Sequence, residues 1–256
     1  MNAATVIKVG TNVLTRPDGR PDLTNISHLV DQLVALKAAG RHPVLVSSGA
    51  VGAGRSLLPG RPDSNEVAQR QVYSALGQVR LMEIYRQLFA GHDLLCAQLL
   101  VTKEDFRDDA HADNMLNCLR ALLHDRIVPV INENDVVAVT ELMFTDNDEL
   151  AGLVARLLGA EALVILSSVD GLYDGPPDDA ASQLIREVRG GDAGAEKFIQ
   201  PKRSSFGRGG MGTKLRIARE TAAAGIPVFL GNGRRTDILA HLNDAPAAWP
   251  GTRVFA

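Results

Sequence analysis

Short apolar runs separated by segments of helical periodicity are the feature that most constrains the fold of this chain. Six runs rich in β-branched residues lie at Thr5–Val9, Pro43–Val46, Leu94–Val101, Ile127–Ile131, Ala162–Leu166 and Pro227–Leu230. Strands that are apolar on both faces are typical of parallel sheets covered by helices. The runs therefore predict a mainly parallel sheet buried between helices.

The segments between the runs predict helices on both faces of that sheet. We expect them at Ile26–Ala39, Glu66–Phe89, Asp113–His124, Asp148–Leu158 and Thr213–Ala224. Asn25 is the expected N-cap of the first helix, and Gly40 follows it where a glycine commonly ends a helix. Alternating strands and helices with right-handed crossovers predict an α/β fold.

Three further segments carry weaker signals. Val136–Phe144 alternates without a helical period and predicts a hairpin, whereas Thr252–Ala256 predicts a closing strand at the edge of the sheet. Gly171–Gly212 is rich in Gly, Pro, Asp and Ser, and this composition is typical of mobile structure.

Composition excludes several classes of protein. The 256 residues are 45% hydrophobic, enough for a sizeable core, and the net charge of −3 creates no field that would attract nucleic acid or a membrane surface. No apolar run approaches the roughly 18 residues of a membrane span, and the N-terminus lacks the pattern of a secretory signal. Cys96 and Cys118, both in apolar surroundings, are too few for a disulfide framework, so we expect a cytoplasmic protein.

Residues suited to ligand binding follow several of the predicted strands. Ligands of open α/β sheets bind beyond the carboxyl ends of the strands, where this chain has Lys8, Ser47–Gly54, Asn132–Asp135 and Ser167–Gly171. Lys8 interrupts a strand that must be buried, so its ammonium either reaches solvent or faces a bound anion. Gly10 favours the anion, because a glycine lets backbone N–H groups approach phosphate oxygens closely.

Two glycine-rich segments each allow two interpretations. The glycines of Ser47–Gly54 either shape a tight strand-to-helix turn or expose amides to a carboxylate or phosphate. Gly207–Gly212 matches the dinucleotide pattern G-x-G-x-x-G, but a polar loop and not a strand precedes it. With Arg208 and Lys214, this segment suits the phosphates of a nucleotide, or it is a flexible surface loop.

Acidic and amide side chains supply acceptors near the same edge. Asn132–Asp135 and Asp146–Asp148 suit an ammonium group, or a magnesium ion reached through water. Asp148 also fits a simple helix N-cap. No histidines lie at the spacing of metal ligands, so the sequence predicts no metal site made by the protein alone.

Six motifs, in order and over nearly the whole chain, resemble those of the amino-acid kinase family. They are Ile7–Thr11, Val46–Ala50, Pro129–Asp135, Asp146–Asp148, Val169–Tyr173 and Gly209–Lys214. The resemblance implies one three-layer α/β/α domain over residues 1–256, with an amino-acid site toward the N-terminal part and an ATP site toward the C-terminal part. Many bacterial relatives carry a C-terminal PUA domain, which we expect this chain to lack.

The combination of Pro129–Asp135 with Asp146–Asp148 is most similar to the members that phosphorylate glutamate. The resemblance implies transfer of the γ-phosphoryl group of ATP, with Mg²⁺, to the side-chain carboxylate of L-glutamate, the first step of proline biosynthesis. It also implies feedback inhibition by proline, a homo-oligomer and functional coupling to glutamyl-phosphate reductase. The alternatives are an acetylglutamate, aspartate or uridylate kinase, a catalytically weak ligand-sensing homologue and, more distantly, a nicotinamide oxidoreductase.

The same motifs assign residues to the implied site. Ser48, Gly49, Asp135 and Asn147 would hold the substrate, and Lys8, Lys214 and Asp148 would be catalytic. The ATP site would comprise Lys8, Gly10, Ser167, Ser168, Arg208, Gly209, Gly210, Met211, Gly212, Thr213 and Lys214. Ser167 and Ser168 replace the Thr-Asp pair usual in the family, so Asp148 is our candidate for the carboxylate that orients the lysines.

Overall fold

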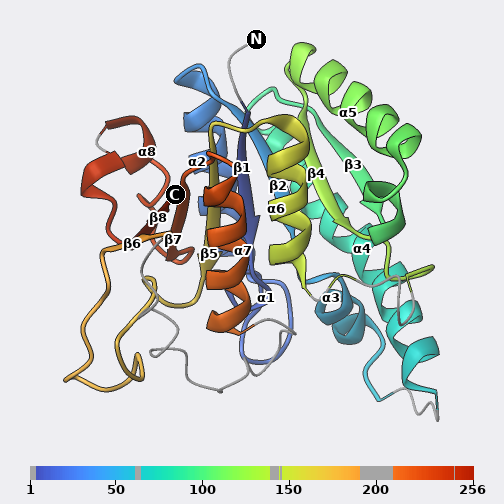
Figure 1. Cartoon of the computed structure of the whole chain (residues 1–256). Helices are drawn as coiled ribbons and strands as arrows, with labels where there is room; N and C mark the ends of the chain where they lie inside the picture. Colours follow the sequence, from blue (N-terminus) through green and yellow to red (C-terminus); the bar gives the residue numbers. More distant parts are fainter. Residues whose placement is uncertain (1–3, 61–64, 139–143, 145, 191–209, 245) are drawn as a thin grey trace.

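An eight-stranded sheet runs through the computed structural model, and helices cover both of its faces (Figure 1). The structure describes residues 4–60, 65–138, 144, 146–190, 210–244 and 246–256. The strands are β1 (Ala4–Val9), β2 (His42–Ser47), β3 (Cys96–Val101), β4 (Val128–Glu133), β5 (Ala162–Ser167), β6 (Glu187–Arg189), β7 (Val228–Asn232) and β8 (Thr252–Phe255). Their order is β3-β4-β2-β1-β5-β7-β8-β6, and only β7 and β8 pair in antiparallel fashion. The expected α/β/α fold with a mainly parallel sheet is confirmed.

The five expected helices lie close to their expected positions; one begins at Glu66 as expected, and the other four begin earlier. They are α1 (Thr11–Leu14), α2 (Leu23–Ala38), α3 (Ala50–Leu57), α4 (Glu66–Ala90), α5 (Asp109–His124), α6 (Asn147–Leu158), α7 (Met211–Ala223) and α8 (His241–Asp244), with the short 3₁₀ helices η1 (Lys103–Phe106) and η4 (Pro246–Ala248). Asp22, Asp108 and Asp146 are the N-caps of α2, α5 and α6, because their carboxylates accept backbone N–H groups of the first turn. The expected caps Asn25 and Asp148 therefore lie inside their helices.

Each face of the sheet has its own hydrophobic core. Side chains of a strand alternate between the faces, so Ile7 and Val9 pack toward α2 and α4, whereas Val6 packs toward α5, α6 and α7. Lys8 has the same parity as Val6 and therefore points toward the layer that contains α6 and α7, which lie beside β1 in Figure 1. This parity decides which helices supply the partners of Lys8.

The edges of the sheet differ from the expectation. The C-terminal strand β8 lies between β7 and β6, so β6 forms that edge instead. At the opposite edge, β3 has partly exposed side chains, including Leu100, and is not covered on both faces. Cys118 is exposed and not in apolar surroundings, while most of the expected hairpin and much of the Gly171–Gly212 segment lie outside the described residues.

Among the helices of the described residues, none combines the length and the apolar character needed to cross a membrane.

Helices α3 and α4 pack with their backbones almost in contact. A Cβ atom added at Gly54 would overlap the carbonyl oxygen of Tyr73, and one added at Gly77 would overlap that of Ala50. Gly49 precedes α3 with a φ of 100°, a left-handed conformation that favours glycine. Gly49 and Gly54 of the glycine-rich segment Ser47–Gly54 therefore serve backbone geometry. Gly54 and Gly77 fix how α4 lies against the end of β2.

We predict that Gly54→Ala destabilises the protein strongly, whereas Gly52→Ala does not. The new methyl group at position 54 has no space, so the free energy of unfolding should fall by at least about 3 kcal/mol. At position 52 on the same helix, the nearest neighbour of an added Cβ is Thr15 at 3.6 Å, and alanine should add about 0.5–1 kcal/mol. Urea unfolding of both variants measures the difference, and equal stabilities would contradict the close packing.

Candidate active site

A cleft of about 1090 Å³ opens where β1, β2, β4 and β5 end and where α6 and α7 begin. The residues of the expected site that line it are Lys8, Gly10, Ser48, Gly49, Asp135, Asn147, Asp148, Ser167, Ser168, Gly210, Met211 and Lys214. The expected amino-acid and nucleotide residues thus share one cavity. Gly212 and Thr213 lie in the first turn of α7 without lining the cleft, and Arg208 and Gly209 lie outside the described residues.

One carboxylate joins the two lysines at the centre of this cleft. Asp148 Oδ1 lies 2.6 Å from Lys8 Nζ, and Asp148 Oδ2 accepts a hydrogen bond from Lys214 Nζ at 2.9 Å. Asp148 is fully buried, and Lys8 is 4% exposed. Asp148 lies in the first turn of α6, Lys214 in the first turn of α7, and Lys8 in β1. Because Lys8 points toward the layer of α6 and α7, the three charged groups meet.

Charge and burial act against each other in this cluster. Burial disfavours the ionised form of Asp148, but the ammonium groups of Lys8 and Lys214 outweigh burial and lower its pKa to about 2. Burial, and then the charge of Lys214, lower the pKa of Lys8, although Asp148 opposes them. For Lys214, the attraction of Asp148 overcomes burial and raises the pKa. Asp148 therefore remains ionised and balances two cations.

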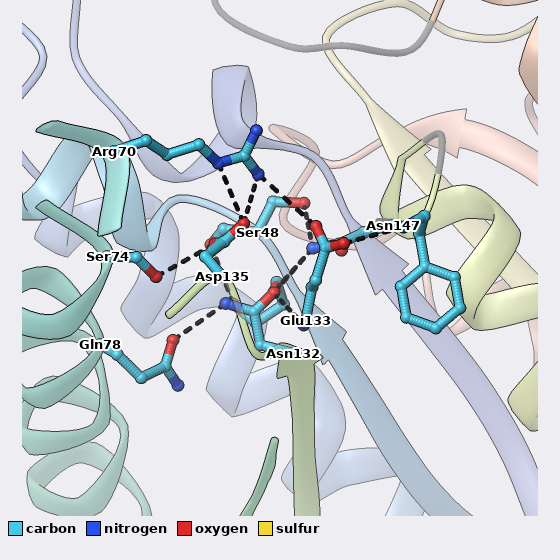
Figure 2. Close-up of polar contacts among 10 residues, drawn as sticks. Ser48, Arg70, Ser74, Gln78, Asn132, Glu133, Asp135 and Asn147 are labelled. Atoms are coloured by element: carbon cyan, nitrogen blue, oxygen red, sulfur yellow. Dashed lines mark hydrogen bonds and ion pairs between the residues drawn. The ribbon is translucent and has the colours of Figure 1, made fainter. Parts of the chain in front are cut away.

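A chain of amide side chains orders the part of the cleft where the amino-acid site is expected (Figure 2). Asn147 Nδ2 donates to Ser48 Oγ at 3.0 Å and to Asn132 Oδ1 at 2.9 Å, and Asn132 donates onward to Gln78 of α4 at 2.9 Å. Asn147 Nδ2 also donates to the carbonyl oxygen of Ser47 at 3.0 Å. These bonds lock the ends of β2 and β4 to the first turn of α6.

An arginine that the sequence analysis missed lies beside Asp135. Arg70 Nε donates to Asp135 Oδ1 at 3.1 Å, its Nη2 forms a close ion pair with the same oxygen, and Ser74 donates to Oδ2 at 3.0 Å. Arg70 Nη2 also lies 3.5 Å from Glu133 Oε2 (Figure 2). Burial and the neighbouring Asp135 charge raise the pKa of Glu133 to about 7.

Asp146 presents a second carboxylate to the cleft. Its Oδ1 accepts the backbone N–H groups of Asp148 and Glu149, as expected of an N-cap. Its Oδ2 is buried and has no hydrogen-bond partner among the described residues. Burial, together with the charge of Asp148, raises the pKa of Asp146 to about 6. A buried acceptor without a partner is costly to the fold, so it marks a place for a donor from a ligand.

The nucleotide half of the expected site is built from backbone turns. Ser167 Oγ donates to the carbonyl oxygen of Val169 at 3.1 Å, which closes the turn at the end of β5, and Ser168 lines the cleft. The N–H group of Gly10 donates to Leu166 O at 3.0 Å, so this amide already has a partner. A Cβ atom added at Gly10 would lie 3.7 Å from Lys8 Nζ, so the glycine leaves the side of the ammonium group uncovered.

Sequence reasoning missed the contribution of α4. Arg70, Ser74 and Gln78 follow one another at intervals of four residues and so share one face of that helix. The spacing of these three polar residues was the signal that could have found them. The described residues hold no group of three or more His, Cys, Asp or Glu side chains able to enclose a metal ion.

Known proteins resemble this chain in sequence and in fold. The chain is 48% identical over 240 residues to a glutamate 5-kinase of Bacteroides thetaiotaomicron, covering 94% of this chain and 66% of that protein. It is 40% identical over 242 residues to a glutamate 5-kinase of Lactiplantibacillus plantarum, covering 93% of this chain and 91% of that one. The chain thus spans just under two thirds of the first relative's length.

Solved structures share the fold at low sequence identity. Carbamate kinase from Giardia lamblia bound to AMP-PNP superposes with a TM-score of 0.70 at 19% identity, over 99% of this chain and 98% of that one. The product complex of isopentenyl phosphate kinase from T. acidophilum superposes with a TM-score of 0.69 at 16% identity, over 98% of this chain and 99% of that one. The model of the amino acid kinase family matches residues 3–232. With this match and the relatives above, the chain belongs to the amino acid kinase family.

Proposed function

We propose that this chain is a glutamate 5-kinase, which transfers the γ-phosphoryl group of ATP to the side-chain carboxylate of L-glutamate. The observation that carries the proposal is the pair of lysines, Lys8 and Lys214, that share the buried Asp148 carboxylate within one cleft. The relatives at 48% and 40% identity, which bear this name, support the choice of substrate.

The chemistry of the reaction explains why such a cluster is useful. A carboxylate is already a nucleophile, so the reaction needs no general base, and the difficulty is to bring two anions together in line. Lys8 and Lys214 would contact the transferred phosphoryl group, and their interaction would strengthen as negative charge spreads over its oxygens. Asp148 would hold both ammonium groups at the reacting position.

The donor set of the cleft also suits magnesium carried by the nucleotide. Magnesium in kinases usually keeps water and phosphate oxygens as ligands and needs few protein carboxylates. Bound with ATP, the ion would neutralise phosphate charge. Ser167, Ser168 and the first turn of α7 would surround the nucleotide.

The remaining residues would hold glutamate. We keep Ser48, Gly49, Asp135 and Asn147 in the proposed site, but Asp135 is 6% exposed and already bound by Arg70 and Ser74. Asp146, whose buried Oδ2 has no hydrogen-bond partner in the described part of the chain, is therefore our candidate for the partner of the substrate ammonium. Asp135 would act through Arg70.

Several wider expectations stay predictions. They are the cytoplasmic location, the homo-oligomer, feedback inhibition by proline and coupling to glutamyl-phosphate reductase. The ligand-sensing alternative rested on Ser168, and the position of Asp148 between the lysines supplies the carboxylate that Ser168 lacks.

Glutamate-dependent formation of ADP tests the proposed function directly. With ATP, Mg²⁺ and hydroxylamine, the protein should release ADP and form glutamyl hydroxamate, because hydroxylamine traps the acyl phosphate. Acetylglutamate, aspartate and uridylate serve as competing substrates. ADP release with one of these and not with glutamate would replace the proposed substrate, and binding of ATP and glutamate without ADP would favour a sensor.

We predict that Lys8→Met and Lys214→Met each lower kcat by about 10²–10³, equivalent to about 3–4 kcal/mol, because each removes one preorganised charge from the transition state. Steady-state kinetics measure the loss, and circular dichroism checks that the variants fold. Arg216→Ala is the control on α7, since Arg216 forms an exposed pair with Glu220. A kcat near that of the wild type would exclude the altered lysine from the reaction.

We also predict that the KM for glutamate rises as the pH falls below about 6. The pKa of Asp146 is raised to about 6, so acid converts the carboxylate to its neutral form, which attracts an ammonium group less strongly. Kinetics between pH 5 and 8 measure this, with Asp146→Asn as the variant that should have a high KM at every pH. If Asp146→Asn retains the wild-type pH profile, another group binds the ammonium.

A further inference from the structure

Arg70 is a cationic side chain of the cleft that is held in place by Asp135, away from the cluster of Lys8, Lys214 and Asp148. The described part of the cleft contains four cations, of which Lys8 and Lys214 bind Asp148. Arg55 is exposed and stacks on the Tyr73 ring, with its guanidinium carbon 5.7 Å from the ring centroid. Arg70, in contrast, is anchored by two donors to one oxygen of Asp135.

The anchoring leaves part of the guanidinium unused. Arg70 holds its acidic neighbours with Nε and Nη2, and its Nη1 has no hydrogen-bond partner among the described residues. The side chain of Arg70 is 29% exposed, whereas that of Asp135 is 7% exposed. Both residues line the cleft, and the arginine is the more exposed of the two.

An α-amino acid brings two charges to this half of the cleft. Its ammonium group would pair with Asp146 Oδ2, which has no hydrogen-bond partner among the described residues. Its α-carboxylate needs a cation other than the two lysines that would contact the phosphoryl group. Arginine binds carboxylates through N–H groups in a rigid plane, and a guanidinium already held on one edge loses little freedom when its other edge binds.

We propose that Arg70 is the specificity-determining residue for the α-carboxylate of the substrate, which it binds through its free Nη1 edge. Asp135 and Ser74 are positioning residues that hold Arg70 in place. The proposal rests on the proposed function, since it names how the amino-acid site selects its substrate, and it explains why Asp135 is buried behind the arginine.

Two analogues of glutamate separate this role from a merely structural one. Glutarate lacks the ammonium group and keeps both carboxylates, whereas 4-aminobutyrate keeps the ammonium group and lacks the α-carboxylate. Calorimetry of each compound with wild type and Arg70→Gln should show glutamate and glutarate binding weakened about 10- to 100-fold, as for a lost charged hydrogen bond. Binding of 4-aminobutyrate should change less than about threefold. Arg70→Lys should recover part of the loss, because it restores the charge without the planar fork.

Controls come from the same helix and the same cleft. Arg80→Ala removes an exposed arginine of α4 that pairs with Glu83, and it should leave the binding of all three compounds unchanged. Arg55→Gln tests the rival cation. An equal loss for 4-aminobutyrate and glutamate in Arg70→Gln, an unchanged affinity for glutarate, or a selective loss in Arg55→Gln alone would each overturn the proposal.

Unfolding of the variant and failure of the proposed function have separate signatures. If Arg70→Gln folds poorly because Asp135 loses its counter-charge, Arg70→Gln with Asp135→Asn removes that charge and should show the same selective loss. Binding is measured without ATP turnover, so the two tests are independent. A wild type that binds glutamate but releases no ADP would contradict the proposed function, and the affinities for the two analogues would still test the role of Arg70.

Discussion

The shared carboxylate of Asp148 is the interaction on which the rest of the site depends. Two ammonium groups brought together inside a protein repel each other, and burial removes the water that would screen them. Asp148 offsets both effects because each of its oxygens faces one lysine. The arrangement requires β1, α6 and α7 to meet at one point, which explains why a central strand of the sheet carries a lysine.

A second constraint governs the other half of the cleft. The close contact of α3 and α4 at Gly54 and Gly77 brings one face of α4 over the ends of β2 and β4. That face carries Arg70, Ser74 and Gln78, whose hydrogen bonds reach Asp135 and Asn132. The glycines form none of these hydrogen bonds, yet the polar network depends on the close approach of the two helices that they permit.

Two acidic groups of the cleft, Glu133 and Asp146, lie where burial makes their ionised forms unfavourable for folding. The pKa values of Glu133 and Asp146 are raised to about 7 and about 6, which means that folding disfavours their charged forms. Such groups are common where a protein keeps charges ready for a ligand. Here Glu133 lies beside Arg70, and Asp146 carries an oxygen without a hydrogen-bond partner among the described residues.

The sequence by itself determined the class of fold, because apolar runs and helical periodicity are local patterns that survive without tertiary information. It also placed Lys8, Asp148 and Lys214 among the candidates, through strand ends, helix starts and family motifs. The order at the sheet edge, the capping role of Asp146 and the occupied amide of Gly10 were decided only by the tertiary structure. So was Arg70, since its partners Asp135 and Glu133 lie more than 60 residues away, and no local pattern records which helix face meets which strand end.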